Sequence, residues 1–231
     1  MKTTGLAGLI LVMLCVLPGA VPPPTQNTTI ALISRVILDV TRKQPDKAWQ
    51  AAKRGEMLSS GERLKTGEKS IAVIKFKDNS MLRVREKTEV LLNDLKDGTS
   101  TLKSTEFERG VIGFSIKKQQ QGEGFRFSSP TSVASVRGTS GQFSASDSLD
   151  KLIVLDGLVV LSSKVSSRAV DVGGGFTGLS YPDGTLQVRP STPEEKVAAE
   201  LSSRTGEQDG RLDIELKDGG GNKKNIEIKF R

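Results

Sequence analysis

Short apolar runs, separated by glycine, aspartate and asparagine, recur along most of the chain and constrain its fold more than any other feature. Residues 55–79 show the pattern well, because Ala72, Ile74 and Phe76 alternate with the residues between them. Such period-2 alternation is typical of strands with one buried face. With only 4% aromatic residues, the sequence predicts an all-β fold with a mostly aliphatic core. A β-solenoid-like arrangement and a β-sandwich both remain open.

The first twenty residues have the organisation of a secretory signal peptide. Lys2 precedes an apolar run over residues 6–17, which at 12 residues is too short to span a bilayer. Residues 18–20, Pro-Gly-Ala, are suited to cleavage by a signal peptidase. We therefore expect a periplasmic or secreted protein of a bacterial envelope, with no membrane span after cleavage. Cys15 is the only cysteine, so we expect no disulfide in the mature chain.

The composition divides the chain into segments. The expected segments are a signal peptide (1–20), a proline-rich leader (21–29), a β domain (30–190) and a C-terminal helix with a β-hairpin (191–231). Thr192, Pro193 and Glu195 have the arrangement of an N-cap, a first helical residue and a capping-box partner. The sequence therefore predicts a short helix that begins here and ends near Leu201.

Two hairpins are expected. Residues 152–161 hold two apolar runs joined by Asp156 and Gly157, and this pair is typical of a two-residue type I′ turn. Because both faces of these runs are apolar, we expect them to be buried on both sides. The second hairpin is expected to pair residues 212–217 with residues 225–230.

The residue types that most catalytic and metal sites need are missing. Histidine is absent and the mature chain has no cysteine, which excludes catalytic triads and zinc sites built on either residue. Two carboxylate pairs, Asp147 with Asp150 and Asp94 with Asp97, are the remaining basis for a glycoside hydrolase. We interpret them as turn residues. We therefore predict no catalytic residue, no cofactor and no metal.

The net charge is +7, and loss of Lys2 with the signal peptide leaves 33 basic against 27 acidic residues, a net charge of +6. The basic residues are interspersed with acidic ones, and aromatic residues that could stack on bases are scarce. We therefore expect no nucleic-acid partner. A modest attraction to anionic surface polymers is the better interpretation of the charge.

Residues 128–143, SSPTSVASVRGTSGQF, place an arginine and a glycine inside an apolar strand pattern. We expect Gly138 to occupy a backbone conformation or a close contact that a side chain would forbid. Arg137 is expected to be a buried and fully paired pin, since a buried guanidinium without partners costs several kcal/mol. The alternative is that Arg137 points outward at a partner.

This stretch resembles the central signature of the FecR-type domain, a T-P-x-x-V/A-x-x-V-R-G-T element followed by a V-x-x-x-x-G-x-V-x-V element. The signature residues, which we expect to act structurally, are Pro130, Thr131, Val136, Arg137, Gly138, Thr139 and Gly157. The resemblance covers about residues 30–172. The upstream part of the pattern is carried by Trp49, Gly55, Leu58, Gly61, Leu64, Thr66, Gly67, Ala72, Phe76, Asp78, Ser80 and Leu82.

The resemblance implies an all-β extracytoplasmic module. In the best-known members this module is the periplasmic part of a transmembrane sigma regulator, which receives a signal from an outer-membrane receptor during iron uptake. This chain begins instead with a signal peptide and a proline-rich leader. We therefore expect a stand-alone exported FecR-type domain without the cytoplasmic sigma-regulator segment.

The sequence thus predicts a non-catalytic binding module of the cell envelope, with a protein partner and a contribution to signalling. The alternative is a structural or glycan-associated envelope scaffold. A carboxylate-based hydrolase is the third class and would need two carboxylates in one cleft.

Overall fold

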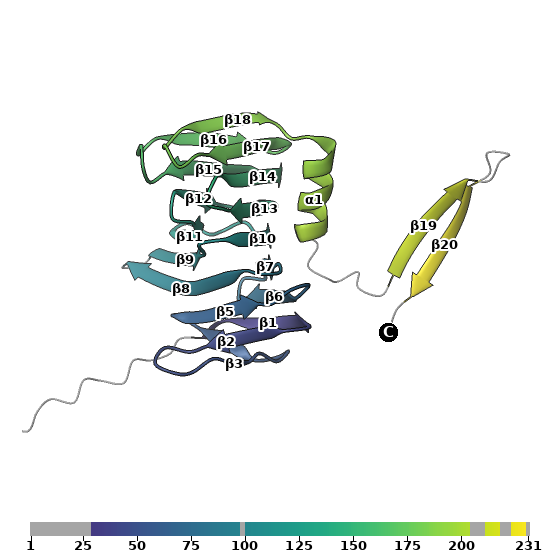
Figure 1. Cartoon of the computed structure of the whole chain (residues 1–231), viewed down its shortest axis with the longest axis horizontal. Coiled ribbons are helices and arrows are strands. Elements are labelled where there is room, and N and C mark those ends of the chain that lie inside the picture. The colour runs from purple at the N-terminus through teal and green to yellow at the C-terminus, as the bar shows by residue number, and fades with distance from the viewer. Residues whose placement is uncertain (1–28, 98–99, 204–210, 218–222, 230–231) are drawn as a thin grey trace, which may run out of the picture.

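The computed structural model describes residues 29–97, 100–203, 211–217 and 223–229. Two nine-stranded sheets, here called sheet A and sheet B, stack face to face, and a single α-helix lies on one side (Figure 1). The expected signal peptide and most of the expected leader lie outside the described residues. The all-β prediction, with one short C-terminal helix and a terminal hairpin, is confirmed.

In spatial order, sheet A consists of β18 (Leu186–Pro190), β17 (Phe176–Ser180), β14 (Asp150–Asp156), β13 (Ser140–Ala145), β10 (Gly110–Ser115), β7 (Met81–Val84), β6 (Ile71–Phe76), β1 (Thr29–Ile37) and β4 (Met57–Ser59). Sheet B consists of β16 (Ala169–Gly173), β15 (Leu158–Ser163), β12 (Ser132–Val136), β11 (Glu123–Ser128), β9 (Ser100–Glu106), β8 (Glu89–Asp97), β5 (Glu62–Thr66), β2 (Val40–Lys43) and β3 (Gln50–Ala51). The helix α1 spans Pro193–Ser203, and β19 (Arg211–Lys217) pairs with β20 (Lys223–Lys229) as a separate hairpin.

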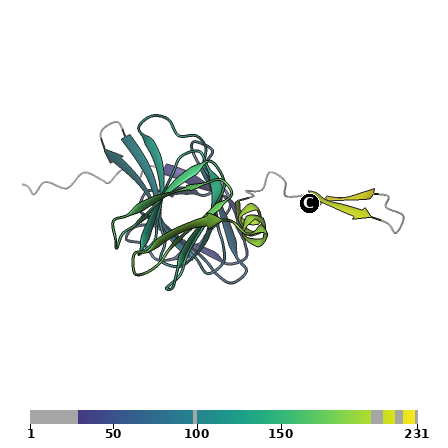
Figure 2. The same cartoon turned by 90° about the horizontal axis from the view of Figure 1, so that it is seen from above.

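The chain passes from one sheet to the other after every one or two strands and advances along the stack from β1 to β18 (Figures 1 and 2). All pairings between neighbouring strands in the two large sheets are antiparallel, except that β9 and β11 are parallel. The fold therefore combines the two arrangements that the sequence left open. It has the two facing sheets of a sandwich and the continuous advance of a solenoid.

The core lies between the two sheets and follows from the alternation in the sequence. In β5, for example, Glu62, Leu64 and Thr66 are buried while Arg63 and Lys65 are exposed. The core is less aliphatic than the composition predicted, because six of the eight phenylalanines are buried in it. Their rings form a continuous series of contacts between the two sheets. The contacting ring pairs are Phe76–Phe125, Phe125–Phe127, Phe114–Phe127, Phe127–Phe143 and Phe107–Phe143.

The hairpin predicted at Asp156 and Gly157 is wrong. Residues on either side of this pair enter different sheets, since β14 lies in sheet A and β15 in sheet B, and the two strands do not pair with each other. Only Gly157 has a positive φ, at 80°, whereas a type I′ turn needs two such residues. Burial on both faces is also found only in β14, because Leu158 and Val160 of β15 are 51% and 36% exposed.

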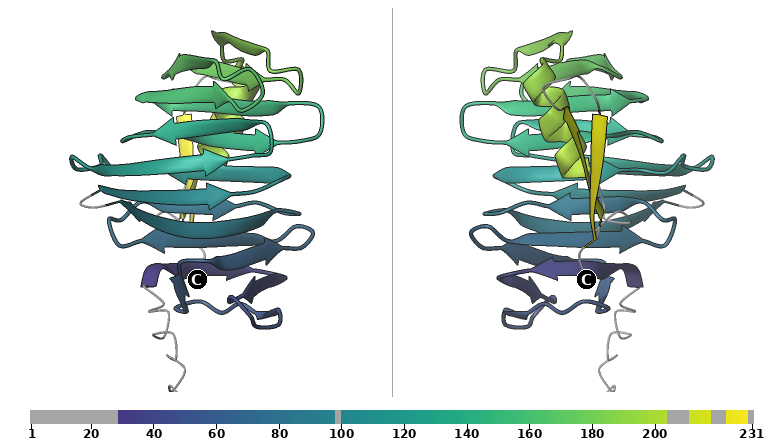
Figure 3. Two further views of the ribbon diagram at one scale, coloured as in Figure 1. Left: turned by 90° about the vertical axis from the view of Figure 1, so that its left-hand side faces the viewer. Right: turned by 90° about the vertical axis from the view of Figure 1, so that its right-hand side faces the viewer.

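The helix α1 packs on the outer face of sheet A, against β10, β13 and β14 (Figure 3). Its contact face is narrow and consists of Ala199 and Ser202, which are buried. The helix comes very close to the sheet at Gly113, where a Cβ atom would lie 1.9 Å from the carbonyl oxygen of Ser202. The hydroxyl of Ser202 also donates a hydrogen bond to Gln142 in β13 at 2.8 Å.

The N-terminal end of α1 is held by Glu195. The predicted capping box is confirmed, because the backbone N–H of Thr192 donates to the Glu195 carboxylate and the N–H of Glu195 donates to the Thr192 hydroxyl. Arg189 donates two hydrogen bonds of 2.8 Å to the same carboxylate, Thr177 donates one of 3.0 Å, and Lys151 lies 3.3 Å away. The Arg189 hydrogen bonds hold the pKa of Glu195 well below its usual range.

Replacing Glu195 with glutamine should therefore destabilise the protein in a pH-dependent way. A carboxyl whose pKa is lower in the folded state contributes stability above its unfolded pKa of about 4.3, and this stability is lost as the pH falls further. We expect the variant to be less stable by about 1.5–3 kcal/mol at pH 7, which is typical of hydrogen bonds to charged groups. Urea unfolding of both proteins at pH 7, 4 and 3 should show this difference shrinking. A difference that stays constant over that range would contradict the assignment.

Candidate functional site

Several of the signature residues make contacts at the two ends of strand β14. At one end, Thr131 and the two serines beside it, Ser129 and Ser132, direct their hydroxyls at the Asp150 carboxylate at 2.5–2.6 Å. Asp150 is only 1% exposed, so these hydroxyls replace the water that the carboxylate loses on burial. Pro130, which lies between Ser129 and Thr131 in the chain, is exposed at the turn between β11 and β12.

At the other end of β14, two chain crossings between the sheets meet. Gly138 and Gly157 both have positive φ, at 68° and 80°, and a Cβ on Gly157 would lie 2.8 Å from the carbonyl oxygen of Gly138. Thr139 is buried, exchanges two backbone hydrogen bonds with Ile116 and donates its hydroxyl to the carbonyl of Leu158 at 3.3 Å. The left-handed conformation expected of Gly138 is therefore found, and it lets the two crossings pack against each other.

Between these ends, Val136 points into the core and is 3% exposed. The expectation of a buried, paired Arg137 is wrong, because the Arg137 side chain is exposed and makes no hydrogen bond or ion pair with any described residue. The reason is the alternation of β12. Ala134 and Val136 face the core, so Ser135 and Arg137 face the solvent.

Replacing Arg137 with alanine should accordingly leave stability almost unchanged. Surface substitutions without specific contacts usually change the free energy of unfolding by no more than about 0.5 kcal/mol. Thermal melts of the wild type and the variant should superimpose within this limit. A loss above about 2 kcal/mol would show that Arg137 has a structural partner after all.

Among the described residues, the arginine that is buried is Arg42 in β2, which is 5% exposed. Its guanidinium donates to Glu62 at 2.5 Å and lies 3.3 Å from Glu56. Glu62 is 1% exposed, and it also accepts a hydrogen bond from the backbone N–H of Ser59 at 3.0 Å. This pair was not predicted from the sequence. The available signal was the position of Arg42 two residues after Val40, on the face of the strand that points inward.

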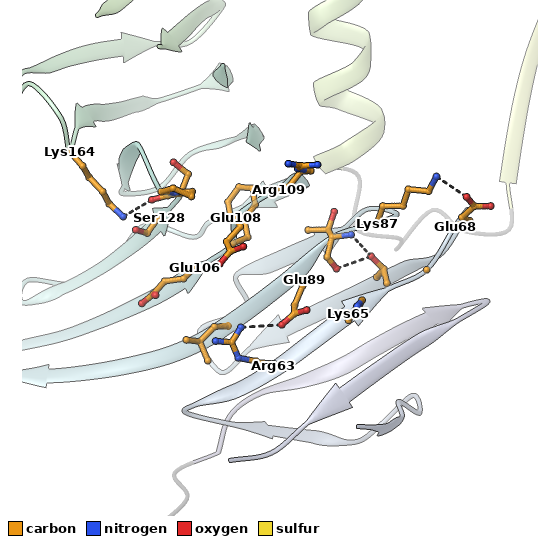
Figure 4. A pocket seen from close by; sticks show the side chains of 17 residues that line it. Arg63, Lys65, Glu68, Lys87, Glu89, Glu106, Glu108, Arg109, Ser128 and Lys164 are labelled. Atoms are coloured by element: carbon orange, nitrogen blue, oxygen red, sulfur yellow. Dashed lines mark hydrogen bonds and ion pairs between the residues drawn. The ribbon is translucent and has the colours of Figure 1, made fainter. Parts of the chain in front are cut away.

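A groove of 780 Å³ opens along one margin of sheet B (Figure 4). It is lined by β5, β8 and the end of β9, together with the residues that follow β11 and β15. Phe107, which is buried, and Leu91 give it an apolar floor. A smaller hollow of 230 Å³ shares Lys65 and Gly67 with the groove and extends to Trp49, which is 39% exposed.

Charged side chains of both signs line the groove. They are Arg63, Lys65, Lys87, Arg109 and Lys164 on the basic side and Glu68, Glu89, Glu106 and Glu108 on the acidic side. Several of them pair with each other. Arg63 lies 3.1 Å from Glu89, and Lys87 lies 2.7 Å from Glu68. The hydrogen bond between Lys87 and Glu68 lowers the pKa of the glutamate and raises the pKa of the lysine. Both groups therefore stay charged, and the groove is suited to polar recognition.

The candidate catalytic pair Asp147 and Asp150 is not arranged for hydrolysis. Asp150 is enclosed by hydroxyls, whereas Asp147 is 82% exposed and paired with Arg109. Of the second candidate pair, Asp94 and Asp97, the side chain of Asp97 lies outside the described part of the chain. Within the described part of the chain, no group of three acidic side chains is placed to hold a metal ion. No helix among the described residues is long and apolar enough to cross a membrane.

Comparison with known proteins finds structures of similar fold and one matching domain family. Two crystal structures of a candidate anti-sigma factor from Parabacteroides distasonis ATCC 8503, at 1.65 and 2.50 Å resolution, each match with a TM-score of 0.50 and 17% sequence identity. The match covers 66% of this chain and 66% of that protein, slightly less than two thirds of its length. At this identity the likeness concerns the fold. No curated protein has a sequence that matches this chain.

The profile of the FecR protein family matches residues 62–160. This range runs from β5 to β15 and includes the groove-forming strands of sheet B and every one of the seven signature residues. It also includes the corner at which Gly138 and Gly157 pack together. What the comparison shows in this chain is therefore a FecR domain at residues 62–160.

Proposed function

We propose that this protein is an exported, non-catalytic FecR-type interaction module of the cell envelope, which binds a protein partner and contributes to signalling. One observation carries the proposal. The FecR domain leaves the outer face of sheet B and its groove free of any helix among the described residues, whereas α1 covers part of the outer face of sheet A (Figure 3). The free face is thus the surface on which a partner would bind.

Three further observations support this function. The groove carries charged side chains above an apolar floor, a combination common at surfaces that bind proteins. The sequence lacks histidine and a mature cysteine, and of the candidate carboxylates Asp150 is enclosed by hydroxyls while Asp147 is exposed and paired with Arg109. The Parabacteroides protein of similar fold is named as a candidate anti-sigma factor, which agrees with a regulatory role for this chain.

The location and the partner can be tested together in cells that produce the protein. The N-terminus of the purified protein should begin near residue 21 if the signal peptide is cleaved. A photo-crosslinking residue placed at Ser135, which is exposed on the outer face of sheet B, should capture a receptor or a regulator of the envelope. The same residue placed at Lys196, which is exposed on α1 over sheet A, is the matched control and should not.

The outcomes separate the proposal from its alternative. Specific capture of a signalling protein at Ser135 supports an interaction module. Capture only of proteins that assemble cell wall or surface polymers would favour the envelope scaffold instead. An uncleaved chain found in the cytoplasm would contradict the proposed export.

A further inference from the structure

The outer face of sheet B presents Arg137 next to exposed aliphatic side chains. The register of β12 and β15 pairs Ser135 with Val160 and Val136 with Val159, so that Arg137 and Leu158 follow as neighbours on the solvent side. Leu158 is 51% and Val160 is 36% exposed. The packing of Gly138 against Gly157 fixes this juxtaposition, because it holds the two crossings together just beyond these residues.

A second arginine lies on the same face. Arg126 of β11 pairs with Ser135 in the register of β11 and β12, which makes Arg126 and Arg137 diagonal neighbours about 7–8 Å apart at their Cα atoms. Arg126 is half-buried, and its Nε is buried without a hydrogen bond. The side chains of Arg126 and Arg137 make no hydrogen bond or ion pair with any residue in the described part of the chain. Two guanidinium groups at this spacing attract an anion between them.

Other arginines of the protein have a carboxylate partner, which Arg126 and Arg137 lack among the described residues. The arginines with a carboxylate partner at 2.5–3.1 Å pair as Arg42–Glu62, Arg63–Glu89, Arg109–Asp147 and Arg189–Glu195. The residues directly opposite Arg126 and Arg137 on the neighbouring strands are serine, glycine and leucine, whereas Glu106 is diagonal to Arg126 and accepts a hydrogen bond from Asn93. The face thus supplies two sets of guanidinium donors and, among the described residues, no carboxylate directly opposite them.

The surface around Arg126 and Arg137 is in part apolar. Gly124 lies two residues before Arg126 on β11 and pairs with Leu102 on β9. The Leu102 side chain covers Gly124 so closely that a Cβ there would lie 3.2 Å from it. Leu95, which pairs with Leu102, is 49% exposed. Because β11 and β12 are hydrogen-bonded to strands on both sides, their backbones have no free edge. A partner must therefore bind here through side chains.

We propose that this surface, defined by Arg126, Arg137, Leu158 and Val160, binds a protein segment that carries a carboxylate flanked by apolar residues. The inference rests on the proposed function and names the partner chemistry of the free face. A carboxylate can accept two parallel hydrogen bonds from a guanidinium group. Arginine is also one of the residue types enriched among those that dominate binding energy at protein interfaces.

The test is selection of a random peptide library on the purified protein, as the producing cell processes it. Selected peptides should be enriched in Asp and Glu next to apolar residues, and their affinity should fall as the salt concentration rises from about 50 to about 500 mM. The double variant Arg126→Gln, Arg137→Gln should bind the selected peptides roughly tenfold or more weakly. The matched control, Lys47→Gln with Arg54→Gln, removes the same charge from exposed positions near β3 and should bind as the wild type does.

Each other result overturns the inference. Peptides without acidic enrichment, or acidic peptides that bind the double variant equally well, would show that these arginines are not the site. Polygalacturonate that binds as tightly as the peptides and competes with them would assign the surface to anionic polymer rather than protein. Both results are independent of capture at Ser135 in cells, so the wider function can stand when this inference fails.

Discussion

Replacing Arg42 with alanine is expected to lower the free energy of unfolding by about 3–5 kcal/mol, the cost of breaking a buried ion pair from one side. The Glu62 carboxylate is 1% exposed in the native structure, and the variant removes its nearest cation. For a protein of this size such a loss corresponds to a fall in Tm of about 6–20 °C. Calorimetry and urea unfolding of the two proteins measure both quantities.

Arg63→Ala is the matched control for this experiment. Arg63 also pairs with a glutamate, at 3.1 Å, but the side chains of Arg63 and Glu89 are 48% and 37% exposed. An exposed pair of this kind contributes about 0–1 kcal/mol. An equal loss in the free energy of unfolding for the two substitutions would mean that the Arg42–Glu62 ion pair does not behave as a buried pair. The double substitution Arg42→Met, Glu62→Leu should recover most of the lost stability, since apolar residues of similar size often replace a buried pair without loss.

The second large effect is expected at Gly138. A valine there would be forced to a φ of 68°, and its Cβ would lie 3.1 Å from the Cα of Lys118. Holding a β-branched residue in this conformation costs about 1–3 kcal/mol, and the close backbone contact adds a similar overpacking cost. We expect Gly138→Val to lose about 2–5 kcal/mol in urea unfolding and to give a low yield of folded protein.

Two other glycines separate the cost of backbone strain from the cost of the close contact. Gly55 has a φ of 87°, and no atom lies within 4 Å of the position that a Cβ would take there, so Gly55→Val tests backbone strain alone. Gly173 has neither a positive φ nor a close neighbour, and Gly173→Val should be nearly neutral. If Gly138→Val proves no worse than Gly173→Val, the corner does not require a glycine.

The elements that depend on neighbouring residues were predictable. The capping box of α1, with Thr192 and Glu195, formed as expected, because its hydrogen bonds join residues three apart. The conformation of Gly138 followed from the same kind of local reasoning. The resemblance on the signature residues also indicated a FecR-type domain, and the profile match places a FecR domain at residues 62–160.

The candidate site was predictable only in part. The seven signature residues were named from the sequence, but the contacts of Thr131 with Asp150 and of Thr139 with Leu158 each join residues 19 positions apart. The groove combines strands and turns from Arg63 to Lys164, and nothing in the sequence indicated that they would meet.

The sequence by itself determined the all-β class, the short capped helix and the resemblance to a FecR domain, since alternation, capping and signature motifs are properties of adjacent residues. Only the tertiary structure decided that Asp156 and Gly157 cross between sheets, and that Arg42 rather than Arg137 is buried. A turn dipeptide serves a hairpin and a crossing equally well, because its local conformation does not select the partner strand. An arginine in a strand is buried or exposed according to which face meets the opposite sheet, and that is set by pairing between residues far apart in the chain.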